Sequence, residues 1–184
     1  FQAGQYINLD FPAGIGTRAF SIAGPPSSNG EIELNIRAVP GGAATGYVHE
    51  VLKVGDKISF TGPFGRFFVR KSANVPLIFM AGGSGLSSPR SMILDMLEEG
   101  FDQPITLIYG QRVREELYYH DEFLALAEKY PNFTYVPALS DEPEGTDWIG
   151  ARGYVHDAAK AHFDNDFRDC LLYTSDAADE RRRV

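Results

Sequence analysis

Apolar and polar positions alternate in short runs over the first 70 residues of the chain. Gly, Pro, Ser and Asn separate these runs, which is the pattern of β-strands joined by turns. The pattern predicts one short helix at residues 45–54 and strands at residues 5–11, 18–24, 31–39 and 56–62. We therefore expect this half of the chain to form a small antiparallel barrel.

The pattern changes after residue 74, where apolar runs of strand length alternate with segments of helical spacing. Strands are predicted at residues 75–82, 104–110 and 133–140, and helices at residues 88–99, 120–130 and 156–163. Strands that alternate with helices indicate a parallel sheet with crossover connections. The polar stretch 70–76 separates the two patterns, so the predicted fold class is a β barrel plus an α/β domain.

Composition narrows the class of protein. The 184 residues are 43% hydrophobic, which is enough to bury the core of one large or two small domains. No apolar run has the length of a transmembrane helix, and residues 1–11 lack the pattern of a signal peptide. We therefore expect a cytoplasmic protein with no membrane association. A net charge of −8 without a long Lys/Arg cluster argues against nucleic acid as a partner.

A glycine-rich segment, "FMAGGSGLSSPRSM" at residues 79–92, connects a predicted strand to a predicted helix. Pro89 suits the first helical turn, and Ser87 or Ser88 is expected to cap the helix. Gly83, Ser84 and Gly85 then lie at the strand-to-helix junction, where free N–H groups and the helix dipole favour an anionic pyrophosphate. The alternative is a tight turn that needs glycine only for its backbone angles.

Three common glycine-loop motifs do not fit this segment. A Walker loop requires a lysine, and none follows these glycines. An esterase elbow requires glycine two positions after the serine, where Leu86 follows Ser84. The usual dinucleotide fingerprint requires a third glycine at Ser88 and an acidic residue after the second strand, where the chain has "YGQR". The remaining interpretation of this segment is a dinucleotide-binding pattern of a different kind.

Several motifs in order make a resemblance specific. A barrel-like half with "RAFS", "GGAAT" and "GPFGRFF" precedes "MAGGSGLSSPRSMI", "YGQR" and "WIGARGYV". Together they resemble the ferredoxin-NADP reductase superfamily, and residues 1–168 resemble within it the reductase components of multicomponent phenol hydroxylases. The resemblance implies an FAD-binding barrel at 1–72, truncated at its N-terminal side, and an NAD(P)-binding domain at 73–169, truncated at its C-terminal side.

The resemblance gives the first motif specific roles. Arg18 would pair with the pyrophosphate of FAD, which suits the planar fork of a guanidinium. Phe20 would pack on the isoalloxazine face, at a position where many relatives have Tyr. Ser21 would reach the flavin N5, where hydride arrives, and is the expected catalytic residue. Without the other motifs, an ordinary edge strand with a solvated arginine would be the preferred interpretation of "RAFS".

Two further groups of residues complete the expected cofactor sites. Gly41, Gly42 and Thr45 would place a helix N-terminus on the FAD pyrophosphate, unless they form only a Gly-Gly turn. Gly83, Ser84 and Gly85 would hold the nicotinamide nucleotide. Its adenosine end is expected near residues 110–119, where Arg112 and Arg114 would attract a 2′-phosphate, and Glu115 and Glu116 would favour a free 2′-hydroxyl. These residues conflict, and we favour NADH over NADPH; all four are equally consistent with solvation of a helix start.

Other residues carry less chemistry. The four histidines are scattered over different elements without the spacing of a zinc site, so no metal site is expected. Trp148 is expected to be structural.

The family would continue with a Cys-Gly-Pro-Pro loop beside the nicotinamide, but Cys170 lacks the Gly-Pro-Pro, so that role is not assigned to it. We expect residues 170–184 to be a non-native tail without a packed element, and the chain to be a fragment.

The sequence thus predicts a flavoprotein reductase that passes electrons from NADH or NADPH through FAD. Their onward path would be a [2Fe-2S] centre in a domain missing from this chain, then an aromatic-ring oxygenase such as phenol hydroxylase. One cysteine cannot supply that centre here. Two alternatives stay open at this stage: a stand-alone flavin or ferric reductase, and a non-enzymatic nucleotide-sensing module. "RAFS" argues against the second.

Overall fold

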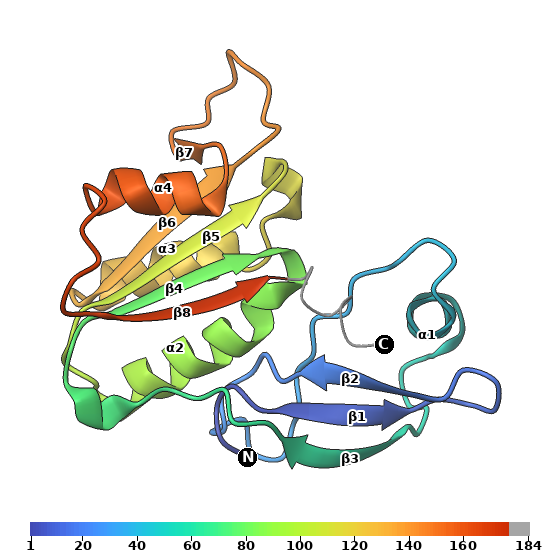
Figure 1. Ribbon diagram of the computed structural model, residues 1–184. Helices are drawn as coiled ribbons and strands as arrows, with labels where there is room; N and C mark the ends of the chain where they lie inside the picture. The colour runs from blue at the N-terminus through green and yellow to red at the C-terminus, as the bar shows by residue number, and fades with distance from the viewer. Residues whose placement is uncertain (177–184) are drawn as a thin grey trace.

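Two sheets lie side by side in the computed structural model, which describes residues 1–176 (Figure 1). The first is antiparallel, with strand order β2-β1-β3. Its strands are β1 (Tyr6–Asp10), β2 (Thr17–Ser21) and β3 (Ser59–Phe64). Alternate side chains of β1 point inward, and Ile7 and Leu9 are buried with Phe11, Ile22 and Ala44. We call this half the antiparallel domain.

The second sheet is parallel, with strand order β7-β6-β5-β4-β8, and we call this half the parallel domain. Its strands are β4 (Leu77–Gly82), β5 (Ile105–Gln111), β6 (Phe133–Leu139), β7 (Ala151–Arg152) and β8 (Leu171–Asp176). The main helices are α2 (Ser87–Glu99), α3 (His120–Lys129) and α4 (Val155–His162). The predicted order of an antiparallel half followed by a parallel α/β half is confirmed.

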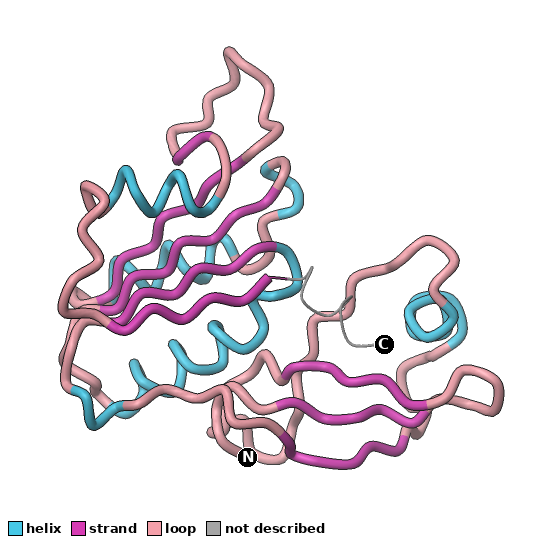
Figure 2. The backbone as a smooth tube through the Cα atoms, viewed as in Figure 1, coloured by secondary structure: helices cyan, strands magenta, loops and turns pink. Residues whose placement is uncertain are grey.

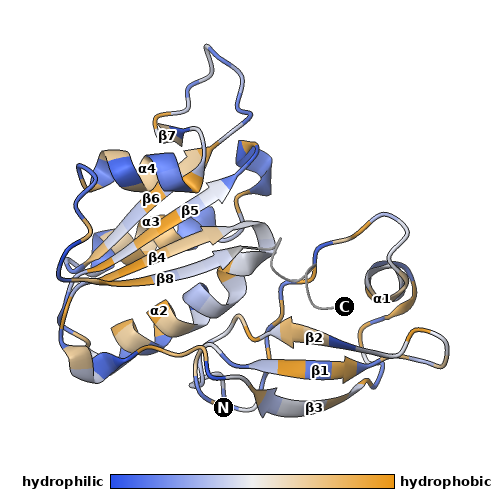
Figure 3. Ribbon diagram, in the orientation of Figure 1, coloured by the Kyte–Doolittle hydropathy of each residue, from blue (hydrophilic) through white to orange (hydrophobic). Residues whose placement is uncertain are grey.

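Helices cover both faces of the parallel sheet. Side chains of α2 and α3, such as Met92 and Phe123, share one core with Phe79 of β4. Ala158 and Ala159 of α4 pack with Ile78 on the opposite face. Figure 3 shows hydrophobic colour along β4 and β6 and hydrophilic segments on α4. Since successive β4 residues are buried on opposite faces, the unbroken apolar run at 77–79 is explained.

Short helical segments connect the larger elements (Figure 2). They are α1 (Ala43–Gly46), the π-helix η1 (Tyr47–Val51), and the 3₁₀ turns η2 (Lys71–Ala73), η3 (Gly83–Leu86) and η4 (Arg114–Glu116). The helix predicted at 45–54 is therefore present but begins at Ala43, and most of its length has π-helical hydrogen bonding.

The strand predicted at residues 31–39 is wrong. Within residues 1–176, the segment forms a single isolated antiparallel bridge, between Leu34 and Ile22, and belongs to no strand. Its apolar side chains pack on the core of the antiparallel domain as the alternation predicts, whereas Glu33 hydrogen-bonds to residues of the parallel domain. The segment is therefore held by side-chain contacts with both domains, in place of the hydrogen bonds to a neighbouring strand that were predicted.

The expectation of no packed element after residue 169 is also wrong. Leu171–Asp176 forms β8, which pairs in parallel with β4 from Leu77↔Leu171 to Gly82↔Asp176. Tyr173 stacks on Phe79 with ring centroids 5.2 Å apart, so the tail contributes an aromatic ring to the main core. The same expectation for residues 177–184 lies outside the described residues. Within residues 1–176, no helix has the combination of length and apolar character that a membrane span requires.

Candidate cofactor-binding sites

The junction between β4 and α2 has the predicted strand-turn-helix form. Gly82 is extended, and Gly83 has φ +55°, a left-handed conformation that glycine adopts without strain. The turn η3 then leads into α2, with Pro89 in its first turn as predicted. The predicted serine cap is wrong: Leu86 is the N-cap residue, and Ser87 Oγ donates instead to the Ser84 carbonyl across 3.0 Å. The 3₁₀ turn moves the helix start ahead of both serines, so neither occupies the cap position.

A cavity of about 440 Å³ opens at the C-terminal ends of β4, β5 and β6, and we call it the crevice. Ligands of open parallel sheets bind at this edge. Of the predicted residues, Gly83, Arg112 and Glu116 line the crevice, whereas Ser84, Gly85, Arg114 and Glu115 do not. Its other lining residues include Arg37, Gly110, Gln111, Ser140, Tyr154, Val155 and His156.

Gly110 allows the start of α4 to approach the end of β5. A Cβ atom at this position would lie 2.2 Å from Cγ2 of Val155, which is far closer than van der Waals contact. Tyr154 and His156 flank Val155, and their rings stack with centroids 5.7 Å apart. Glycine at the end of β5 therefore lets α4 close one side of the crevice with these two rings.

The charged residues expected at the adenosine end are largely paired within the protein. Arg112 Nε donates to Oδ2 of Asp141 across 2.8 Å, and this hydrogen bond holds the pKa of the exposed Asp141 carboxyl below its ordinary value. Arg114 Nη1 lies 2.9 Å from Oδ1 of Asp147, and its guanidinium lies over the ring of Trp148. Glu115 is exposed, while Glu116 lines the crevice.

The "RAFS" motif occupies β2 in the antiparallel sheet. Arg18 is opposite Leu9, and its Nη1 donates to the Thr17 carbonyl across 2.8 Å, which leaves most of its donors in solvent. Phe20 is half-buried and packs edge-on against Phe11, with ring centroids 6.3 Å apart. Ser21 ends the strand, and within the described residues its hydroxyl has no hydrogen-bond partner. It is therefore available to a ligand.

The "GGAAT" motif forms the turn into α1. Gly42 is the N-cap residue, and Gly41 has φ +73°. Thr45 Oγ1 accepts from the Val39 N–H across 3.1 Å and so braces the turn. A cavity of about 550 Å³ is lined by Gly41, Gly42 and Thr45 together with Ile15 and Tyr47. The structure thus brings these three predicted residues to one cavity, although α1 has only four residues and a correspondingly small dipole.

Sequence reasoning missed several residues of the crevice. Arg37 comes from the antiparallel domain, and Gln111, Tyr154 and His156 come from the parallel domain. The rule that ligands bind at the carboxyl ends of parallel strands identifies Gln111, because it follows the apolar run of β5. No comparable rule identifies Arg37, since its contact with the crevice depends on how the two domains pack. Arg90, a buried arginine of α2, was also missed.

Metal ligation finds no support in the described part of the chain. Across residues 1–176, no three His, Cys, Asp or Glu side chains group as a metal site. His120 packs against Trp148 and Tyr135, and burial lowers the pKa of its imidazole. Trp148 is buried and donates from Nε1 to the Ala151 carbonyl across 3.0 Å, so its predicted structural role is confirmed.

Comparisons with known proteins agree with this architecture. The oxidoreductase FAD-binding domain family matches residues 1–69, and the oxidoreductase NAD-binding domain family matches residues 79–176. The reductase component DmpP of phenol 2-monooxygenase from Pseudomonas sp. (strain CF600) is 59% identical over 167 residues, covering 91% of this chain and 47% of the relative. The phenol hydroxylase P5 protein of Acinetobacter pittii (strain PHEA-2) is 55% identical over 165 residues, covering 90% and 47%.

Among solved structures, the Amycolatopsis cytochrome P450 reductase GcoB superposes with a TM-score of 0.86 at 31% identity, covering 95% of this chain and 52% of that one. The chain therefore spans about half the length of the relatives that it matches. The matches cover both domains in the order that the fold shows. The chain belongs to the ferredoxin-NADP reductase superfamily, whose members join an oxidoreductase FAD-binding domain to an oxidoreductase NAD-binding domain.

Proposed function

We propose that this chain is the flavin- and nucleotide-binding core of a reductase that serves an aromatic-ring oxygenase such as phenol hydroxylase. The FAD-binding part would be residues 1–72, and the nucleotide-binding part would be residues 73–169 together with the strand β8. The observation that carries the proposal is the arrangement of two cofactor elements, "RAFS" on β2 and the Gly83 turn before α2, in two domains in contact. The names of the two phenol hydroxylase relatives support the oxygenase partner.

The donor set of the crevice fits a nicotinamide nucleotide. Gly83 brings backbone close to the cavity, and Gly110 keeps the end of β5 free of a side chain. Tyr154 and His156 present stacked rings at its wall, and Arg37 supplies a cation for a pyrophosphate. We propose Gly83, Ser84 and Gly85 as the turn that holds this nucleotide, with Arg112 near its adenosine end.

The antiparallel domain fits a flavin dinucleotide. Arg18 offers an exposed guanidinium for a pyrophosphate, and Phe20 offers a half-buried aromatic ring. Gly41, Gly42 and Thr45 line a second cavity beside the same core. When bound, FAD accepts a hydride and releases electrons singly, a chemistry that no side chain supplies. The chain's contribution would be to bind and orient: Arg18 by charge, Phe20 by packing, and Ser21 by a hydroxyl beside the reacting ring.

We propose NADH as the reductant. A 2′-phosphate would have to compete with Asp141 for Arg112 and with Asp147 for Arg114, and it would meet the carboxylate of Glu116. A free 2′-hydroxyl faces no such competition, since it is neutral and can donate to a carboxylate. We propose that the reductase works in the cytoplasm, where it would use NADH. The further electron path, through an iron-sulfur centre outside these residues, belongs to the same proposal.

The proposal is tested by adding FAD to the purified chain and following flavin fluorescence and visible absorbance. We expect saturable binding, and bleaching of the flavin absorbance on anaerobic addition of NADH. Arg18→Gln should weaken FAD binding, whereas Arg168→Gln, which removes an exposed arginine that pairs with Asp166, should not. Absence of any saturable change in flavin fluorescence or absorbance during the titration overturns the proposal. Reduction of free flavin at the rate of bound flavin would instead favour a stand-alone flavin reductase.

A further inference from the structure

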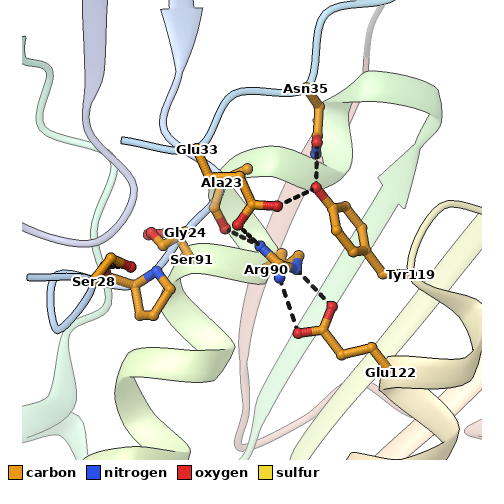
Figure 4. Close-up of polar contacts among 10 residues, drawn as sticks. Ala23, Gly24, Ser28, Glu33, Asn35, Arg90, Ser91, Tyr119 and Glu122 are labelled. Carbon is orange, nitrogen blue, oxygen red and sulfur yellow. Dashed lines mark hydrogen bonds and ion pairs between the residues drawn. The ribbon is translucent and has the colours of Figure 1, made fainter. Parts of the chain in front are cut away.

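A buried arginine joins the two domains at a point between the two cofactor elements. Arg90 of α2 is 7% exposed, and its guanidinium contacts three other segments (Figure 4). Nη1 donates to the Ala23 carbonyl across 2.9 Å and to Oε2 of Glu33 across 2.8 Å. On the other side, Nε and Nη2 donate to the two carboxylate oxygens of Glu122, each across 2.9 Å. A buried cation with this many partners is satisfied only when both domains are in place.

Tyr119 completes this group of residues, which we call the Arg90 cluster. Its ring centroid lies 3.9 Å from the Arg90 guanidinium carbon, and its hydroxyl lies 2.7 Å from Oε1 of Glu33. Tyr119 has φ +56°, a left-handed conformation that is strained for a non-glycine residue. The contacts of its side chain with Arg90 and Glu33 offset that strain. Burial and the contact with Glu33 raise the pKa of Tyr119, so its hydroxyl stays protonated.

The segment of the antiparallel domain that meets Arg90 has a two-sided pattern. Ile32, Leu34 and Ile36 pack on the core of their own domain. The residues between them contact the parallel domain: Glu33 in the Arg90 cluster, Asn35 at the Tyr119 hydroxyl, and Arg37 at the crevice. Alternation along an extended chain thus places three polar side chains in a row on the domain interface.

The position of the cluster relates it to the reacting groups. Ala23, whose carbonyl accepts from Arg90, is fully buried and lies two residues after Ser21. On the other side, Arg90 lies in the second turn of the helix that begins after the Gly83 turn. Beside it, Ser91 Oγ donates to the Gly24 carbonyl across 2.7 Å, which repeats the link between these two segments.

We infer that Arg90 is a positioning residue that fixes the Ser21 end of β2 relative to the Gly83 turn, acting through Glu33, Tyr119 and the Ala23 carbonyl. The catalytic part of this inference rests on the proposed function, because it assumes that flavin and nucleotide meet between these two elements. Hydride transfer requires reacting atoms in near contact, and a displacement of 1 Å from a distant substitution costs about a hundredfold in rate. The structural part, that Arg90 sets the geometry of the two domains, is independent of any cofactor.

The chemistry of the cluster explains why arginine is needed. The guanidinium is a planar fork whose donors point in fixed directions, so it binds Glu122 through two nitrogens while Nη1 reaches the other domain. A lysine at this position supplies the charge but only one nitrogen, and it cannot contact Glu122, Glu33 and Ala23 in this way. The cluster therefore depends on geometry in addition to charge.

Domain geometry is measured without cofactor by the distance between two spin labels. Labels are attached to Lys57→Cys in the antiparallel domain and Glu128→Cys in α3, both exposed positions, in a Cys170→Ser background. We expect one narrow distance distribution for this parent chain. Arg90→Met and Arg90→Lys should each broaden or shift it, and Arg168→Met should not.

A milder pair of variants guards against a chain that fails to fold. Glu33→Gln removes only the partly exposed carboxylate on the antiparallel side, and Glu31→Gln makes the same change two residues earlier, where the side chain is exposed. We expect Glu33→Gln to broaden the distance distribution and Glu31→Gln to leave it unchanged. Unchanged distance distributions for both Arg90→Lys and Glu33→Gln overturn the inference. The inference is also overturned if Arg90→Lys matches the parent in both the distance distribution and the rate of flavin reduction.

The catalytic part is measured by stopped-flow reduction of the flavin in the same variants. If Arg90 positions the cofactor elements, Arg90→Lys should slow reduction by roughly tenfold to a hundredfold at saturating NADH. The dissociation constants for FAD and NADH should change little, because Arg90 contacts neither cavity. A normal reduction rate with a broadened distance distribution overturns the catalytic part alone. Failure of the parent chain to bind FAD overturns the proposed function and leaves the distance measurement valid.

Discussion

Arg112, which lines the crevice, donates from Nε to Oδ2 of Asp141 on the loop after β6, across 2.8 Å. If this pair disfavours a 2′-phosphate, Asp141→Asn should release the guanidinium for it. We expect the ratio of kcat/KM for NADPH to that for NADH to rise roughly threefold to fivefold, a modest change because the pair is exposed and screened by solvent. Glu144→Gln is the control, since it removes a charge from the same loop at an exposed side chain. Equal ratios in both variants would argue against this basis for nucleotide choice.

The close approach of Gly110 and Val155 predicts a clash that a second substitution relieves. Gly110→Ala places a methyl group against Cγ2 of Val155, and we expect it to lower the free energy of unfolding by roughly 1–3 kcal/mol. It should also weaken NADH binding, because α4 must move away from the crevice. Val155→Ala in the same chain removes the contacted methyl and should recover part of both losses. Chemical denaturation and NADH titration measure the two effects, and no recovery would mean that the clash is not their cause.

Ser21 is expected to act at the reacting flavin ring and to contribute little to FAD affinity. Ser21→Ala should slow flavin reduction by about tenfold, which corresponds to the loss of one hydrogen bond in the transition state. The dissociation constant for FAD should change much less. Ser59→Ala, an exposed serine at the start of β3 in the same sheet, provides the matched control. Stopped-flow reduction at the parent rate would contradict the placement of Ser21.

Glu33 predicts a dependence of stability on pH. Burial alone would raise its pKa, but hydrogen bonds from Tyr119 and Arg90 outweigh burial and hold the pKa below its ordinary value. A carboxyl group with a lowered folded-state pKa stabilises the fold fully above its unfolded-state pKa, and this stabilisation is lost as the pH falls through the folded-state pKa. The second carboxylate of the cluster, Glu122, lies on the other side of the Arg90 guanidinium.

The corresponding measurement is urea denaturation of the parent and of Glu33→Gln between neutral pH and pH 3. We expect the parent to be the more stable chain at neutral pH, and the difference to shrink below about pH 4.5 as the carboxylate is protonated. Glu31→Gln should follow the parent at every pH. A difference that stays constant over the whole range would exclude the carboxylate charge as its source.

The sequence was sufficient for those elements whose signals are local. The turn at Gly83 and the helical spacing of Met92, Ile93 and Met96 lie within a few residues of one another, and the structure confirms the strand, the turn and the buried helix face. The alternation of Ile32, Leu34 and Ile36 also predicted the buried face of that segment correctly. The same alternation wrongly predicted a strand ladder, because hydrogen bonding requires a neighbouring strand that a local pattern does not reveal.

The parts that could not be predicted depend on contacts distant in sequence. Arg90 and Glu33 are 57 residues apart, and nothing near either residue indicates the other. Arg37 reaches the crevice only because the two domains pack as they do. The strand at 171–176 was missed for a similar reason. The composition of the tail does not reveal that it pairs with β4, which lies almost 100 residues earlier in the sequence. Site chemistry at such positions requires the tertiary structure.

The two-sided segment at residues 32–37 has a consequence for how this chain tolerates insertions and deletions. Removal of a single residue there shifts every later side chain to the opposite side of an extended backbone. Leucine or isoleucine would then face the carboxylate of Glu122 and the guanidinium of Arg90, and a charged side chain would enter the core around Ile7 and Ile22. Deletion of one residue would therefore disrupt the packing of both domains, although the segment has neither regular strand nor helix structure. A deletion scan should therefore find this stretch as intolerant as the central strands, whereas the exposed loop around Gly145 should accept the same change.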